Sequence, residues 1–292
     1  MPRRHLRIRL QLQARLGCRR WIGGRDRRLG GLGAPLRRVW GGIAAASLAA
    51  SLILLAASLA AAEDQVAAPG AAREPGPTGA GASAKFLLFS GTDFWRDGAF
   101  LYGGLVWSPA GLDRDGFTLK GLIGGGTYRY NSGALSTEVD GREYMGSVMA
   151  GWRFKVDRLE ATVLVGPDFQ DHKLTPDDPG GRLRGRYFGG RAGLDVWYEP
   201  TPTLMAAVNT SVSTIASEYA ARGAFGFRVL DRLYVGPEAE TLGCVGYRVF
   251  RFGAHATGLK FGSFEWSAGG GWADDSDRRA GAYGHIGVLA RY

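Results

Sequence analysis

The sequence predicts an all-β fold, an antiparallel β-barrel of about twelve strands, preceded by a leader and a flexible linker. Three observations predict it. About twelve extended segments follow one another from residue 85 onward, most alternate apolar and mixed residues with a period of two, and their connections alternate between short and long. Many segments reach about 11 to 15 residues, whereas strands of soluble proteins usually have about 5 or 6. Their number and length therefore favour a barrel that crosses a membrane.

The first 62 residues differ in composition from the rest of the chain. They hold 12 of the 36 basic residues, all of them arginine, and only one of the 27 acidic residues, Asp26. Removing these leaves 24 basic and 26 acidic residues, a net charge of −2, so the formal charge of +9 belongs to the leader. A basic balance confined to a leader gives no reason to expect a nucleic-acid partner.

Residues 43–62 form an Ala-rich apolar run that ends in Ala60 and Ala62, the small residues that a signal peptidase needs. We interpret residues 1–62 as a signal peptide or leader cleaved after Ala62; the alternative is a single transmembrane anchor. Residues 63–84 are rich in Pro, Gly and Ala and are expected to be a disordered linker. Residues 85–292 then form the barrel. With Cys18 in the leader and Cys244 alone in the mature chain, we expect neither a disulfide nor a Cys-based metal site.

Alternation defines the expected strands and assigns each side chain to a face. In one segment, Val148 and Trp152 share a parity, and Ser147 and Arg153 have the other. Because successive side chains of a strand point to opposite faces, one face is apolar and the other mixes glycine with charge. The expected strands span roughly residues 85–95, 99–108, 116–130, 142–154, 158–170, 184–198, 203–214, 218–229, 232–242, 246–260, 263–273 and 280–292.

A soluble β-sandwich would alternate in the same way, so three further features place the barrel in the bacterial outer membrane. Aromatic residues gather at strand ends, as in the interfacial girdles of membrane barrels. The connections at 155–157 and 199–202 are short, whereas those at 131–141 and 171–183 are longer and polar. The last strand alternates apolar residues up to the terminal Tyr292 and is expected to pair with the first, which removes both sheet edges.

With the apolar parity facing lipid, the other parity points into the lumen. The charged and titratable residues expected there are Lys120, Arg153, Glu160, Asp168, Arg191, Asp195, Arg222, Arg228, Glu238, Glu240, Arg251, His255, Glu265 and His285. Buried charges need partners, so one interpretation is a network of ion pairs that fills a narrow interior. The functional alternative is a polar conduit or binding groove for a hydroxyl-rich glycan. Its candidate stacking residues are Tyr187, Trp197, Tyr234 and Tyr247.

Eleven glycines share the lumenal parity. They either widen the lumen or relieve crowding where strands coil and long side chains cross, and we expect the second. These glycines are Gly124, Gly126, Gly151, Gly166, Gly189, Gly193, Gly226, Gly236, Gly253, Gly269 and Gly271.

An enzyme is the competing class, because some small membrane barrels are hydrolases that place a histidine beside a nucleophile or a carboxylate. His172 is expected in a polar extracellular loop, DFQDHKLTPDDPGG, with four aspartates around it. His255 and His285 have lumenal parity, and a Ser–His pair stays open for both. No G-x-S-x-G or H-E-x-x-H motif occurs in the sequence. We therefore expect a non-catalytic protein with no catalytic residues, no cofactor and no metal.

Two stretches of the sequence also resemble a known protein family. The run SGTDFWRDGAFLYGGLVWSPAGLDRDGFTLKGLIGGGTYRY at residues 90–130, with the later YRVFRFGAHATGLKFG, resembles the alphaproteobacterial cellulose biosynthesis protein BcsS family over about residues 85–292. The resemblance implies an outer-membrane barrel that serves cellulose synthesis and export as an accessory. It leaves open a docking or structural component and a narrow glycan-binding channel, with an enzyme acting on surface lipid or glycan as the alternative. The implied partners are outer-membrane lipid and either the cellulose synthase and export complex or the cellulose chain.

Overall fold

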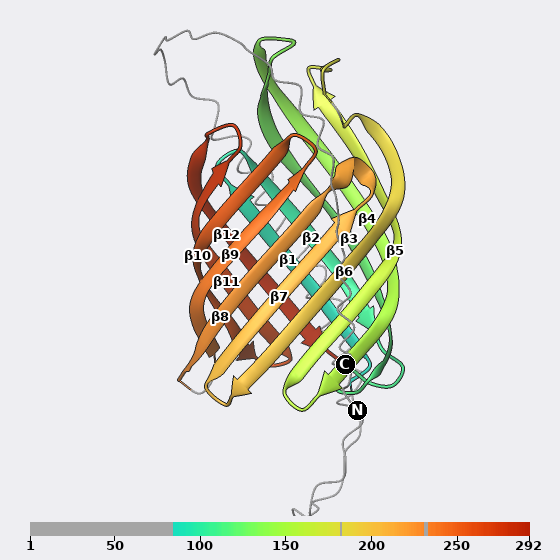
Figure 1. The fold of residues 1–292 in the computed structure, drawn as a ribbon, viewed down its shortest axis with the longest axis vertical. Helices are drawn as coiled ribbons and strands as arrows, with labels where there is room; N and C mark the ends of the chain where they lie inside the picture. The colour runs from blue at the N-terminus through green and yellow to red at the C-terminus, as the bar shows by residue number, and fades with distance from the viewer. Residues whose placement is uncertain (1–83, 182, 231–232) are drawn as a thin grey trace, which may run out of the picture.

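Twelve antiparallel strands form one closed barrel (Figure 1). The computed structural model describes residues 84–292 except 182, 231 and 232, so the predicted signal peptide and almost all of the predicted linker lie outside the described residues. Consecutive strands pair along the chain, and β1 also pairs with β12, as predicted. The elements are β1 (Phe86–Trp95), β2 (Gly98–Trp107), β3 (Gly116–Ser132), β4 (Thr137–Val156), β5 (Leu159–Thr175), β6 (Gly185–Thr201), β7 (Leu204–Ser213), η1 (Ile215–Ser217), β8 (Tyr219–Val229), β9 (Leu233–Cys244), β10 (Tyr247–Phe261), β11 (Phe264–Asp275) and β12 (Ala280–Arg291).

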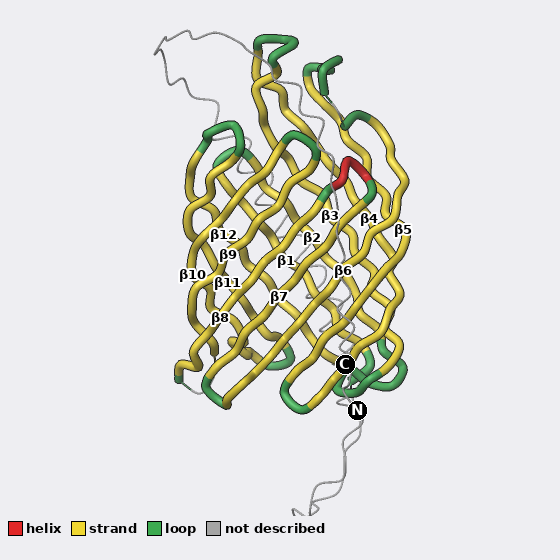
Figure 2. Tube along the Cα trace, viewed as in Figure 1, coloured by secondary structure: helices red, strands yellow, loops and turns green. Residues whose placement is uncertain are grey.

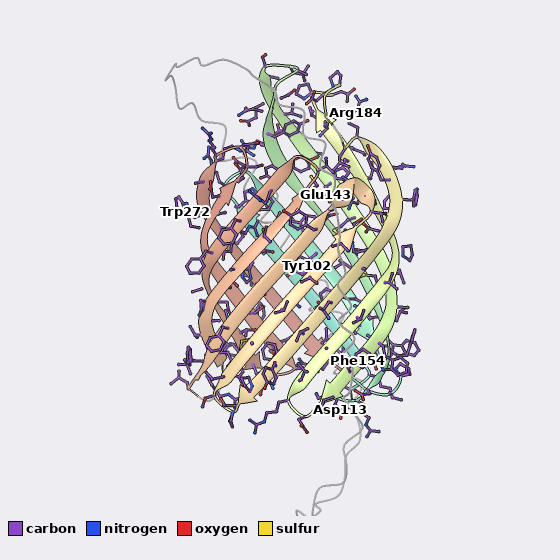
Figure 3. The ribbon with its side chains drawn as sticks, in the orientation of Figure 1. Tyr102, Asp113, Glu143, Phe154, Arg184 and Trp272 are labelled. Atoms are coloured by element: carbon purple, nitrogen blue, oxygen red, sulfur yellow. The ribbon has the colours of Figure 1, made fainter. Side chains whose placement is uncertain are left out.

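The outer surface of the barrel is apolar. Phe188 is 81% exposed and Ile123 is 71% exposed, although both have large hydrophobic side chains. Figure 3 shows Phe154 and Trp272 projecting away from the barrel wall. Monomeric soluble proteins rarely expose such continuous apolar surface, whereas a transmembrane barrel needs it for contact with lipid. The predicted outer-membrane barrel is therefore confirmed. Among the described residues, no helix is long and apolar enough to cross a membrane.

The two rims of the barrel differ (Figure 2). At one rim the chain reverses over two residues at 157–158, 202–203 and 262–263, and the N–H of Lys85 donates to the carbonyl of Tyr292. The first rim also has one longer connection, at 108–115. The opposite rim has two-residue turns at 96–97 and 245–246, and its other four connections are longer, at 133–136, 176–184, 214–218 and 276–279. Since outer-membrane barrels have short periplasmic turns and longer extracellular loops, the first rim is the periplasmic end and the second is the extracellular end.

The extracellular connections after β3 and β5 are shorter than the sequence predicted. We expected loops at 131–141 and 171–183, but β3 and β4 are joined by 133–136 alone and β5 continues to Thr175. In the extension, Asn131 pairs with Glu138, and Ser132 with Thr137. These residues carry no apolar alternation because both faces of a strand can be polar outside the bilayer, so hydrophobic periodicity could not reveal them.

The lumenal glycines relieve crowding. A Cβ atom would come within 3.0 Å of another heavy atom at ten of the eleven positions. At Gly151 and Gly166 it would overlap the backbone carbonyls of Val163 and Val148. Gly193 is the exception, because its Cβ would meet its nearest neighbour, the carbonyl oxygen of Thr210, at 3.5 Å. Glycine therefore lets neighbouring strands coil closely almost everywhere, and at Gly193 alone of the eleven an added Cβ would make only an ordinary van der Waals contact.

Gly151→Ala is expected to destabilise the barrel, because the added methyl group must displace the backbone of β5. Overpacking of this kind costs about 1 to 3 kcal/mol. Samples are heated to a series of temperatures before electrophoresis, and the measurement is the temperature at which the folded, fast-migrating band disappears. Gly121→Ala is the control, since a Cβ at Gly121 meets nothing within 4 Å. Equal unfolding temperatures for the two variants would contradict the packing role of Gly151.

Candidate functional site in the barrel lumen

Contacts between strands that are not neighbours define the interior of the barrel. Arg251 of β10 contacts Asp93 of β1, and Lys120 of β3 contacts Asp195 of β6. In a closed sheet of this strand order, each pair is three strands apart, so its side chains meet only inside the barrel. Since side chains alternate along each strand, these contacts fix the inward parity.

The fourteen charged and titratable residues named from the sequence all have this inward parity, and most contact one another. The structure brings together Arg153 and Glu160, Arg191 and Asp168, Lys120 and Asp195, Arg222 and Glu238, Glu238 and His285, and Arg251 and Glu240. The other three have different partners: Arg228 contacts Glu199 and Tyr234, Glu265 contacts Arg291, and His255 contacts the carbonyl oxygen of Phe225.

The Arg251 cluster consists of Arg251, Asp93, Glu240, Trp95 and Tyr283. The Arg251 guanidinium donates to both Asp93 oxygens, at 2.7 and 3.0 Å, and to Glu240 Oε2 at 3.0 Å. Its Cζ atom lies 4.6 Å from the Trp95 ring centre and 5.2 Å from that of Tyr283. The side chain is 1% exposed. Two carboxylates and two aromatic rings therefore compensate a cation that has lost almost all contact with water.

The Glu238 cluster adjoins it and consists of Glu238, Arg222, Tyr283 and His285. Arg222 Nε donates to Glu238 at 3.1 Å, the Tyr283 hydroxyl donates at 2.9 Å, and His285 Nε2 lies 2.9 Å from the same carboxylate. Tyr283 belongs to both clusters, because its hydroxyl donates to Glu238 while its ring faces Arg251. Strands β8, β9, β10, β12 and β1 are thereby connected through one continuous set of interior contacts.

The Arg191 cluster lies on the other side of the lumen. Arg191 donates to both oxygens of Asp168 at 3.1 Å and to Glu218 at 3.1 Å. The Ser213 hydroxyl donates to Asp168 at 2.6 Å, and the Gln170 amide donates to Glu218 at 2.5 Å. Glu218 follows η1 in the connection between β7 and β8, so this connection supplies a carboxylate to the interior instead of projecting into solvent.

Solvent access differs between the two halves of the lumen. The Arg251 and Arg191 clusters lie in the extracellular half, because Arg251 is four residues from the extracellular end of β10 and Arg191 is six from that of β6. Glu238 lies at mid-depth, six residues from the extracellular end of β9 and five from its periplasmic end. The Asp168 and Arg191 side chains are 0% and 5% exposed. In the periplasmic half, Lys120 and Asp195 remain 21% and 36% exposed. Burial varies within each half, since Arg222 is 32% exposed and Arg153 is 8% exposed. The most deeply buried ion pairs, at Arg251 and Asp168, lie toward the outside of the cell, and the Lys120–Asp195 pair in the periplasmic half keeps contact with solvent.

The four candidate stacking residues fall into separate places. Trp197 and Tyr234 meet near the periplasmic end, with ring centres 6.1 Å apart in a T-shaped arrangement. Tyr187 packs edge-on against His172 at 6.2 Å, and the Tyr247 hydroxyl donates to Asp275 at 3.3 Å. Both of the latter lie at the extracellular end. The structure thus brings Trp197 and Tyr234 together, whereas Tyr187 and Tyr247 lie at the opposite end of the lumen.

The three histidines contact polar groups other than a nucleophile. His172 Nε2 lies 3.1 Å from Gln170 Oε1, His255 Nε2 lies 3.2 Å from the Phe225 carbonyl oxygen, and His285 contacts Glu238. The predicted position of His172 in an acidic extracellular loop was wrong. It lies within β5, paired with Glu143 of β4, and it is buried. Within the described ranges, no group of three or more His, Cys, Asp or Glu residues is arranged to hold a metal ion.

Asp178 anchors the connection between β5 and β6 at the extracellular rim. The Tyr130 hydroxyl donates to Asp178 at 2.9 Å, and the Gly180 N–H donates at 2.9 Å. Desolvation alone would raise the pKa of Asp178, but hydrogen bonds from Ser132, Tyr130 and Gly180 outweigh it and hold the pKa below its usual value. An ionised carboxylate therefore fixes this loop to the extension of β3.

The lumenal residues named from the sequence do not include several members of these clusters. Asp93, Trp95 and Tyr283 have the inward parity of their strands, and aligning that parity along β1 and β12 would have found them. Glu218 begins the expected strand 218–229 and shares the parity of Arg222 and Arg228, so the same alignment would have found it, although in the structure it lies just before β8.

Comparisons with known proteins found one matching family and several similar solved structures. The family model described as cellulose biosynthesis protein BcsS matches residues 87–292. No curated protein matches the sequence significantly. Similar solved structures include a deletion mutant of the TodX monoaromatic hydrocarbon channel, with 8% identity, a TM-score of 0.47, and coverage of 72% of this chain and 90% of that one. The β domain of the Bordetella autotransporter BrkA has 14% identity, a TM-score of 0.45, and coverage of 72% and 99%. The KdgM porin has 12% identity, a TM-score of 0.39, and coverage of 70% and 99%.

Arg251→Ala is expected to lower the free energy of unfolding by about 3 to 5 kcal/mol, because it leaves Asp93 and Glu240 buried without their cation. Arg129→Ala is the control. Arg129 contacts Glu138 at 3.3 Å on the exposed extension of β3, where a surface ion pair contributes at most about 1 kcal/mol. Urea unfolding in detergent micelles, followed by tryptophan fluorescence, measures both. A loss at Arg251 no larger than at Arg129 would show that the Arg251 cluster contributes little to stability.

Proposed function

Because the chain belongs to the cellulose biosynthesis protein BcsS family, we propose that it is a non-catalytic outer-membrane component that docks the cellulose synthesis and export apparatus at the cell surface. In this role the barrel holds its partners in place, and the cellulose chain crosses the membrane elsewhere. The observation that carries the proposal is the filling of the extracellular half of the lumen by ion pairs that reach between distant strands.

The energetics of these ion pairs support a barrel that stays closed. A glycan chain that crossed the extracellular half would have to displace Arg251 or Glu238 from its partners. Breaking a buried charged pair costs about 3 to 5 kcal/mol, because the remaining charge loses its compensation. Twelve strands also enclose a much narrower lumen than the 16 or more strands of open porins. Spontaneous opening is therefore rare, and docking suits this interior better than conduction.

The environments of the histidines support a non-catalytic role. A histidine that activates a serine or a water keeps one ring nitrogen free to take up a proton near the nucleophile. The contacts of these rings are to groups that are not nucleophiles: His285 Nε2 lies against the Glu238 carboxylate, which also accepts from Arg222 and Tyr283, and His255 Nε2 lies against a backbone carbonyl. These contacts connect strands across the lumen and suit a structural role.

Deleting the gene tests the docking role. Cells without the protein are expected to make the same total cellulose and to retain less of it at the surface, because attachment is lost while synthesis continues. Surface and total cellulose are measured separately by dye binding to intact cells and by acid hydrolysis. A chain carrying His172→Ala, His255→Ala and His285→Ala should restore surface cellulose if it is folded. A parallel fall in total and surface cellulose, or failure of this folded variant, would contradict non-catalytic docking.

The purified barrel is expected to be electrically silent in a planar lipid bilayer. Replacing Arg222 and Glu238 together by glycine removes volume from the closed half without leaving a lone charge, and is expected to produce conductance steps. The matched control replaces Lys120 and Asp195 by glycine in the open half and should remain silent. Steady conductance steps from the wild-type barrel would overturn the closed-barrel proposal.

A further inference from the structure

We propose that the periplasmic half of the lumen is a blind vestibule that binds the end of a neutral, hydroxyl-rich glycan chain. Asp195 and Trp197 of β6 and Asn209 of β7 form its wall, and Gly193, midway along β6, lies at its inner end. The identity of the glycan as a β-linked glucan rests on the proposed function, whereas the vestibule itself follows from the geometry of the lumen.

The wall of the vestibule is lined by small side chains. Neighbouring β6 and β7 pair Gly193 with Ser211 and Trp197 with Ala207, and β8 places Ala224 opposite Ala207. A side chain added at Gly193 would have only ordinary contacts, in contrast to the other lumenal glycines. Between these small residues, Asn209 is exposed although its side chain points into the barrel. Exposure of an inward-facing residue indicates space for solvent or a ligand.

Polar groups suited to sugar hydroxyls converge on this space. Asp195 accepts a hydrogen bond from Lys120 at 2.9 Å and another from Asn209 at 3.0 Å. The Asp195 side chain is 36% exposed, so its carboxylate keeps capacity to accept from a ligand hydroxyl. Lys120 and Asn209 supply further donors. Because the charges of Lys120 and Asp195 balance each other, the site favours a neutral ligand over an anionic one.

Trp197 supplies an apolar surface beside these polar groups. It lies two residues from Asp195 on the same face of β6, which places their Cα atoms about 7 Å apart along the strand. Its ring is held edge-on against Tyr234, and its Nε1–H donates to Glu199 at 3.0 Å. A fixed aromatic surface next to a few convergent polar groups is the usual composition of a small-molecule site.

A second hollow extends the vestibule along the periplasmic half. It has a volume of about 150 Å³, and its lining includes Phe89, Thr257, Glu265 and Ser267. Lys120 connects the two regions, because its Nζ atom bonds Asp195 and lies 5.7 Å from the centre of the Phe89 ring. On the extracellular side, the Arg251, Glu238 and Arg191 clusters close the lumen. A ligand therefore enters from the periplasm and does not pass through.

The test is isothermal titration of the detergent-solubilised full barrel with cellohexaose. The wild type is expected to bind, and Gly193→Leu is expected to weaken binding at least tenfold by filling the vestibule. Gly121→Leu is the matched control on the lipid-facing wall of β3 and should bind like the wild type. Asn209→Leu gives a second blocking variant, which decides the outcome if Gly193→Leu does not yield a folded band on gels. An anionic hexamer of galacturonate should bind the wild type at least tenfold more weakly than cellohexaose.

Three results would overturn the vestibule: no binding of cellohexaose to the wild type, unchanged binding by folded Gly193→Leu or Asn209→Leu, or equal affinity for the galacturonate hexamer. A different measurement tests the docking function, namely the comparison of surface with total cellulose after gene deletion. A deletion strain that loses surface cellulose, combined with a barrel that does not bind cellohexaose, would reject the vestibule and leave docking in place.

Discussion

The pairing of β1 with β12 is the constraint on which the other features of the structure depend. In the hydrocarbon region of a membrane, an unpaired backbone N–H or C=O group has no water to bond, so an open sheet edge costs several kcal/mol for each unpaired group. Nine consecutive residue pairs, from Leu87 with Arg291 to Trp95 with Tyr283, close the sheet and leave no edge in that region. Closure then separates the two parities of each strand completely. One parity contacts lipid and the other is confined to the lumen.

Confinement determines the chemistry of the lumen. A charge placed on the outer face would meet lipid, so the charged residues of the membrane-spanning strands lie inside. In a narrow interior they lose water as well, which makes each unpaired charge unfavourable. Arg251 illustrates the consequence, since it is compensated by two carboxylates from β1 and β9 and by two aromatic rings. The contacts that compensate these buried charges also hold distant strands together and fill the lumen.

Most of the fold could be predicted from the sequence because lipid outside and polar groups inside impose a strict period of two. The parity of β4, with Trp152 outside and Arg153 inside, follows directly from this alternation. Partners in the lumen could not be predicted in the same way. Asp93 and Arg251 are 158 residues apart, and their contact depends on how the closed sheet staggers its strands, which periodicity does not encode. The extensions of β3 to β5 were missed because residues outside the bilayer need no alternation.

The unequal filling of the lumen has a physical consequence for function. A uniformly filled barrel would offer a partner only its rims, and a uniformly open one would let solutes cross the outer membrane. Here the most deeply buried ion pairs, at Arg251 and Arg191, lie toward the extracellular end. In the periplasmic half, β6 and β7 pair Trp197 with Ala207, and the nearby Lys120–Asp195 pair stays partly exposed. The permeability barrier and the accessible polar surface therefore occupy different levels of one barrel. Under the proposed function, this separation keeps the outer membrane sealed while a polar surface faces the periplasm.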